Sequence, residues 1–152
     1  MIDFSKILFL DIETVSQQKS YEDLSERMQK LWDKKTSPLL KPGEETTPAE
    51  MYERAGIYAE FGKIICISVG FFNGDRFRLK SFYSHDEKAL LIDFANLLNR
   101  FYDFPESQLC AHNGKEFDFP YIARRMIVNG VVVPRALQVA GKKPWETNFI
   151  DT

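Results

Sequence analysis

An apolar run that leads directly into two acidic residues is the strongest constraint on the fold of this chain. Residues 7–10 read ILFL, and Asp11, Ile12 and Glu13 follow at once. A continuous apolar run of this kind is typical of a β-strand covered on both faces, in the middle of a sheet. Because successive strand side chains point to opposite faces, Asp11 and Glu13 share one face. The sequence therefore predicts two carboxylates at the end of a central strand.

The spacing of these two acids suits a cation. Residues two apart on a strand lie roughly 6 to 7 Å apart, so unpaired carboxylates there repel each other. Divalent ions bound by carboxylate oxygens offset this repulsion, and pairs of such ions suit the spacing. The alternative is that the strand has reached water and that Asp11 and Glu13 begin a solvated loop. The pair alone leaves both interpretations open.

Residues 17–60 carry a helical pattern in place of a strand pattern. Thr47, Pro48 and Glu50 form a capping box with proline at the first helical position, so a helix is predicted from there to about residue 59. We interpret this stretch as a helical insertion between two strands of a single domain that covers residues 1–152.

The remainder of the chain alternates strands and helices. Residues 63–72 and 76–83 read as strands joined by Asn73-Gly74, the strongest short hairpin signal, so these two strands should be antiparallel. Ser84 and Glu87 predict a second capping box before a helix with a wide apolar stripe. A short strand at 108–112 and a helix begun by Asp118 complete an α/β pattern with helices packed on a mixed sheet.

Composition limits the function classes. No run approaches the roughly 18 apolar residues that a membrane span requires, and the start MIDFSK lacks the features of a secretory signal, so we expect a cytoplasmic protein without membrane contact. The net charge of −2 excludes a broad basic surface, so any nucleic-acid contact must be local or metal-mediated. Cys66 and Cys110 lie in apolar runs and are expected to fill a core.

A second acidic cluster follows the strand at 108–112. Residues 111–125 read AHNGKEFDFPYIARR, which places Asp118 at the start of the next helix. Aspartate is a common N-cap residue, so in isolation Asp118 is best explained as a helix cap.

Together the two clusters resemble a known group of enzymes. DIET at 11–14 and HNGKEFDFP at 112–120 resemble the first and second motifs of the DEDD superfamily of 3′–5′ exonucleases. Residues 58–72 and the preceding insertion look most like the bacterial group related to the exonuclease domain of family B DNA polymerases. The resemblance implies a ribonuclease H-like three-layer fold, whose mixed sheet has its first three strands antiparallel. It also implies hydrolysis of phosphodiester bonds at the 3′ end of DNA, with two Mg²⁺ or Mn²⁺ ions.

Carried over residue by residue, the resemblance assigns roles to six positions. Asp11, Glu13 and Asp118 match the catalytic metal ligands. Thr14 matches the position that meets the terminal 3′ hydroxyl, and Asn113 and Phe117 match residues that line the groove for the scissile nucleotide. The expected partner is nucleic acid, with single-stranded DNA 3′ ends preferred.

One departure affects the expected activity. The superfamily has a third motif, in which a Tyr or His precedes a fourth aspartate and orients the attacking water. Asp151 follows no Tyr or His at suitable spacing, so we expect the chain to end before that motif and to be inactive or nearly so. The alternative is a non-catalytic nucleic-acid-binding module on the same fold.

Overall fold

The computed structural model describes residues 3–40, 43, 45–102, 106–143 and 146–152. The chain forms two compact units, and each is described separately. The first comprises Met1–Glu13 with Ile64–Thr152, and the second is Thr14–Lys63. The second unit nearly coincides with the stretch 17–60 that the sequence predicts as a helical insertion.

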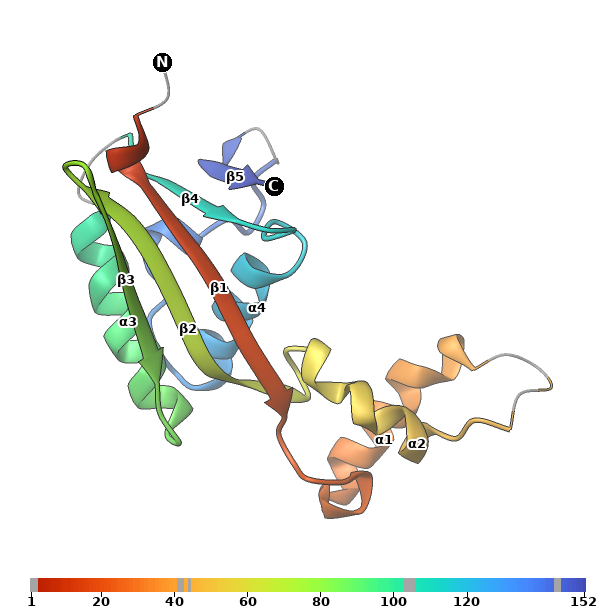
Figure 1. Cartoon of the computed structure of the whole chain (residues 1–152). Coiled ribbons are helices and arrows are strands. Elements are labelled where there is room, and N and C mark those ends of the chain that lie inside the picture. Colours follow the sequence, from red (N-terminus) through yellow and green to blue (C-terminus); the bar gives the residue numbers. More distant parts are fainter. Residues whose placement is uncertain (1–2, 41–42, 44, 103–105, 144–145) are drawn as a thin grey trace. The chain divides into compact units, whose positions relative to one another are not determined.

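A five-stranded mixed sheet has the order β3-β2-β1-β4-β5. The strands are β1 Ile7–Ser16, β2 Gly62–Asn73, β3 Arg76–Tyr83, β4 Gln108–Ala111 and β5 Phe149–Asp151. β2 pairs antiparallel with β3 around the Asn73-Gly74 turn, whereas β4 is parallel to both β1 and β5. β1 and β2 run in opposite directions (Figure 1). The α/β class and the mixed sheet with its first three strands antiparallel are thus confirmed.

Helices α3, Glu87–Phe101, and α4, Asp118–Val128, lie on one face of this sheet (Figure 1). Phe82 of β3 packs on Phe94 of α3, with ring centroids 5.8 Å apart, and both side chains are buried. Phe77 is five residues from Phe82, so strand alternation points it to the opposite face. There its ring meets those of Phe9 and Phe72, at 6.1 and 5.0 Å between centroids.

The capping box predicted at Ser84 and Glu87 is wrong. The N-cap of α3 is Asp86, whose carboxylate accepts a hydrogen bond from the Ala89 N–H at 3.2 Å. Glu87 instead turns inward and accepts hydrogen bonds from the Ile64 N–H at 2.7 Å and from Arg125 Nε at 2.9 Å. Glu87 therefore joins β2, α3 and α4.

This inward carboxylate remains ionised. Burial raises the pKa of Glu87, but hydrogen bonds from Arg125, the Ile64 N–H and Asn129 lower it, and the result lies below the ordinary value. The guanidinium of Arg125 and the carboxylate of Glu87 form a buried ion pair, with side chains only 4% and 9% exposed.

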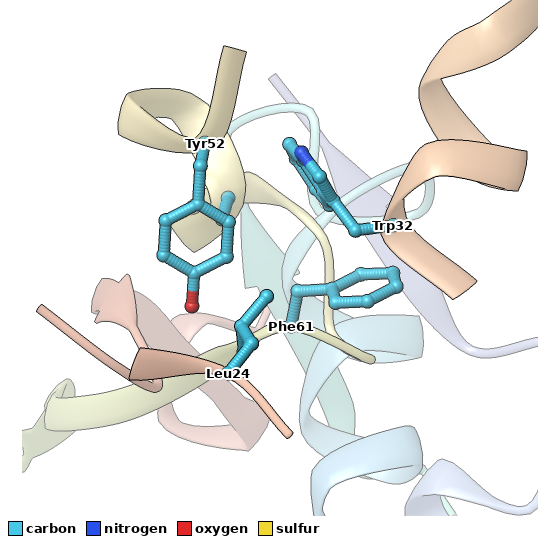
Figure 2. Close-up of a cluster of buried hydrophobic side chains, with 5 residues drawn as sticks. Leu24, Trp32, Tyr52 and Phe61 are labelled. Atoms are coloured by element: carbon cyan, nitrogen blue, oxygen red, sulfur yellow. The ribbon is translucent and has the colours of Figure 1, made fainter. Parts of the chain in front are cut away.

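The second unit has its own apolar core around Trp32, which lies on helix α1, Glu26–Thr36 (Figure 2). The indole is fully buried, its centroid lies 5.3 Å from that of Tyr52 and 5.0 Å from that of Phe61, and its Nε1 donates to the Pro48 carbonyl at 2.7 Å. Leu24 and Ala55 complete the cluster.

The predicted capping box of the second unit is confirmed. Thr47 accepts from the Glu50 N–H, and the Glu50 carboxylate accepts from the Thr47 N–H. Helix α2, Pro48–Met51, is nevertheless shorter than predicted, because Tyr52–Ile57 continues as a 3-10 helix.

Among the residues that the structure describes, none belongs to a helix with the length and hydropathy needed to span a membrane.

Candidate active site

The first acidic pair lies within β1, not after its end. β1 continues to Ser16, and Asp11 and Glu13 are exposed on either side of the buried Ile12. Both carboxylates therefore share one face of the strand, as the alternation predicts. The expectation that the strand ends at Leu10 is wrong, because Ile12, between the two acids, is buried like Leu8 and Leu10 and the strand continues to Ser16.

The end of β4 opens an edge of β1 beside these acids. The register pairs Ile7 with Gln108 and Phe9 with Cys110, and β4 ends one residue later at Ala111. On this side β1 therefore extends beyond β4, and Ile12 lies past the last position that pairs with β4.

Asp118 lies close to this part of β1. Its carboxylate lies near the backbone N–H of Ile12, which contributes to lowering its pKa. Since Ile12 lies between Asp11 and Glu13, this proximity places Asp118 beside the acidic pair. Asp118 is the first residue of α4, not its cap, because the N-cap position is occupied by Phe117.

The charge state of Asp118 reflects this crowded position. The residue is only 3% exposed. Burial, followed by the negative charge of Asp11 and, more weakly, that of Asp151, raises its pKa to about 6, although the N–H groups of Asp118 and Ile12 act in the opposite direction. A buried carboxylate next to other acids is stabilised in its charged form by a cation.

The donor set is consistent with a divalent ion but is not a complete cage. Carboxylate oxygens are the ligands that Mg²⁺ and Mn²⁺ prefer. Within the described residues, however, no three His, Cys, Asp or Glu side chains are grouped closely enough to hold an ion together. The structure therefore brings Asp11 and Asp118 together and leaves the participation of Glu13 as a prediction.

The expected substrate-contacting residues lie in different parts of the molecule. Asn113 and Phe117 belong to the loop between β4 and α4, where the Asn113 carbonyl accepts hydrogen bonds from the Glu116 and Phe117 N–H groups at 3.2 and 3.0 Å. Asn113 has a positive φ of 52°, which asparagine tolerates better than most residues. Thr14 belongs to the second unit, so its role at the acids remains a prediction.

Sequence reasoning missed one acidic residue of this region. Asp151 ends β5, where it pairs with Ala111, the last residue of β4. Its Oδ1 accepts a hydrogen bond from the Gly114 N–H at 2.8 Å. The carboxyl ends of parallel strands meet at one edge of a sheet, and this rule, applied to the acid that ends NFID, could have located it.

Comparison with known proteins was made by family and by structure. A family model described as "Predicted 3'-5' exonuclease related to the exonuclease domain of PolB" matches residues 57–151, a stretch that includes Asp118 and Asp151. No curated protein matches the chain. A solved family B DNA polymerase from the hyperthermophilic archaeon Pyrobaculum calidifontis is similar, with 15% identity and a TM-score of 0.46 over 82% of this chain and 11% of that one. Because the family match covers more than half of its residues, the chain belongs to the family of predicted 3′–5′ exonucleases related to the exonuclease domain of PolB.

Proposed function

We propose that this chain is a metal-dependent exonuclease domain that hydrolyses phosphodiester bonds at the 3′ end of DNA. The observation that carries the proposal is the buried Asp118 carboxylate, which lies near Asp11 and whose pKa is raised to about 6 by burial and neighbouring acids. An arrangement of this kind destabilises the metal-free protein and favours bound cations. Family membership supports a nucleic-acid substrate.

In this proposal Asp11, Glu13 and Asp118 hold Mg²⁺ or Mn²⁺, with two ions in the complete site. Bound ions of this class lower the pKa of water and neutralise the charge that develops on phosphate and leaving oxygen. The chain itself holds the helix turn that carries Asp118 through the hydrogen bond from the Phe119 N–H to the Gly114 carbonyl at 2.9 Å. The exposed position of Asp11 on β1 leaves its carboxylate accessible to a metal ion from solvent.

Substrate positioning falls to three further residues. We assign Thr14 to the terminal 3′ hydroxyl, and Asn113 and Phe117 to the groove for the last nucleotide. The Phe117 ring is half-buried and packs on Tyr121, with 5.3 Å between centroids. An aromatic ring held in this way offers a surface on which a base can stack. We expect single-stranded 3′ ends to be preferred, because stacking requires an unpaired base.

A nuclease assay with protein in excess over DNA tests the proposal even if turnover is slow. Single-stranded DNA labelled at its 5′ end is incubated with Mn²⁺, and substrates with free and blocked 3′ ends are compared. We expect stepwise shortening of the free 3′ end only, lost in Asp11→Asn and Asp118→Asn and retained in Glu116→Gln, an exposed acid of the same loop. Cleavage of the substrate with a blocked 3′ end, or cleavage by the Asp11→Asn variant, would contradict the proposal.

One observation favours a second candidate function. Since the described residues group no three metal-ligating side chains, the fold could serve as a non-catalytic nucleic-acid-binding module. This alternative predicts DNA binding that is unchanged by chelation and by Asp118→Asn, with no shortening of DNA at any Mn²⁺ concentration.

A further inference from the structure

The loop that delivers Asp118 to β1 is attached to the sheet at Gly114. The backbone N–H of Gly114 donates to Asp151 Oδ1 at 2.8 Å, and its carbonyl accepts from the Phe119 N–H at 2.9 Å. Phe119 directly follows Asp118. A chain of two hydrogen bonds therefore runs from the end of β5, through Gly114, to the first turn of α4.

Packing around Gly114 leaves little room for another arrangement. Gly114 is buried, and a Cβ at this position would lie 2.5 Å from the Ala111 Cβ and 2.9 Å from the Phe119 ring. The Phe119 ring in turn packs on that of Phe149 in β5, with 4.1 Å between centroids. The loop is thus held against β4 and β5 on the side where Asp151 binds it.

Asp151 itself is only lightly involved in packing. It is exposed, it ends a three-residue strand, and its pairing with Ala111 uses the backbone. Its side chain can therefore be changed with little loss of buried apolar area. The feature that such a change removes is the acceptor for the Gly114 N–H.

We propose that Asp151 is a positioning residue, which fixes the loop at Gly114 and thereby holds the first turn of α4, the turn that carries Asp118. This inference rests on the proposed function for its consequence in catalysis, since it concerns how one proposed metal ligand is held. The role depends on an acceptor oxygen, not on negative charge.

Amide hydrogen exchange of the whole chain tests the role directly, because the Phe119 N–H, which donates to the Gly114 carbonyl, reports the position of the residue next to Asp118 without any need for activity. In Asp151→Ala and in the similarly shaped Asp151→Leu we expect the Gly114 and Phe119 amides to exchange at least about tenfold faster. The Ile64 amide, held by Glu87 in the same unit, should keep its wild-type rate. Asp151→Asn retains an acceptor oxygen and should preserve protection at Phe119.

Two results would overturn the proposal. The first is a Phe119 amide that stays protected in both Asp151→Ala and Asp151→Leu. The second is an Asp151→Asn variant that loses protection as fully as the alanine variant, which would show that charge matters rather than the acceptor.

A parallel Mn²⁺ titration separates this inference from the proposed function. We expect about tenfold weaker Mn²⁺ binding in Asp151→Ala, near wild-type binding in Asp151→Asn, and no effect of Glu116→Ala, an exposed acid on the same loop. If wild-type protein binds no Mn²⁺, the proposed function fails, whereas the exchange rates still decide the positioning role.

Discussion

The carboxylate of Asp118 lies near the backbone N–H of Ile12, although the two residues are 106 positions apart along the chain. This proximity places the first turn of α4 beside the part of β1 that extends beyond β4. It is also what brings the second acidic motif to the first. The consequences for stability and metal binding follow from it.

Replacing Asp118 by Asn should stabilise the metal-free protein at neutral pH. The folded pKa of about 6 lies above the ordinary aspartate value of 3.8, so the folded state holds this proton more tightly than the unfolded state. The free energy of unfolding should therefore fall as pH rises from about 4 to 6, and Asp118→Asn should remove that decline. At pH 7 we expect the variant to be more stable by about 1 to 3 kcal/mol.

Denaturant unfolding at pH 4 and pH 7 in EDTA measures this effect. The control is Asp93→Asn, which changes an exposed acid of α3 and should have the wild-type free energy of unfolding at both pH 4 and pH 7. An Asp118→Asn variant that is less stable than wild type at pH 7 would show that other groups in the folded protein already stabilise the negative charge of Asp118.

Removing Glu87 should cost far more stability than removing a surface acid. Glu87→Ala leaves the buried Arg125 guanidinium and the Ile64 N–H without their acceptor, and breaking a buried pair in this way typically costs about 3 to 5 kcal/mol. The matched control is Glu106→Ala, which breaks an exposed pair with Lys6 and should cost less than about 1 kcal/mol. Urea unfolding measures both variants, and an equal loss of unfolding free energy in Glu87→Ala and Glu106→Ala would contradict this prediction.

Trp32 should control the stability of the second unit through both volume and hydrogen bonding. Trp32→Phe removes the donor to the Pro48 carbonyl and should cost about 1 to 3 kcal/mol, whereas Trp32→Ala also opens a cavity and should cost about 3 to 5 kcal/mol. Leu31→Ala, at a 45% exposed neighbour on α1, should have a much smaller effect. Hydrogen exchange within residues 14–63 would measure the loss of stability in all three variants. A loss of stability in Leu31→Ala as large as that in Trp32→Ala would argue against this core.

Two glycines of the first unit should respond differently to alanine. In Gly114→Ala the new Cβ meets the Ala111 Cβ at 2.5 Å, so the loop must move and Asp118 with it. We expect a loss of about 1 to 3 kcal/mol together with weaker Mn²⁺ binding. In Gly70→Ala the contact is the outer end of the Phe77 ring, which is 48% exposed and can rotate away. Thermal melts and Mn²⁺ titrations of both variants should therefore show a clear effect on binding only for Gly114→Ala, and an equal effect in Gly70→Ala would contradict the account.

The sequence predicts well those elements whose signals are local. The β2–β3 hairpin follows from Asn73-Gly74 and period-2 alternation, and the bounds 76–83 agree with β3. The Thr47–Glu50 capping box is local in the same sense and is confirmed. The antiparallel arrangement of the first three strands was predicted only through the resemblance, because pairing between distant strands leaves no local pattern.

The failures arise where a distant partner outweighs the local signal. Ser84 and Glu87 have the spacing of a capping box, yet Glu87 bonds to Arg125, 38 residues further on. Asp118 has the position of a helix cap, yet its carboxylate is turned to β1. Asp151 matches no expected motif, and only the parallel pairing of β5 with β4 brings it to Gly114. In each case tertiary contacts, not propensity, decide where the side chain goes.

A Mn²⁺ titration of wild type, Asp11→Asn and Asp118→Asn at pH 7.5 and pH 5, followed by calorimetry, tests the central claim most directly. The account predicts binding by wild type that weakens as pH falls through about 6, where Asp118 takes up its proton, and that is reduced at least about tenfold in either variant. Binding of equal strength in wild type and Asp118→Asn, or no binding by wild type at pH 7.5, would contradict a metal site built on these two carboxylates.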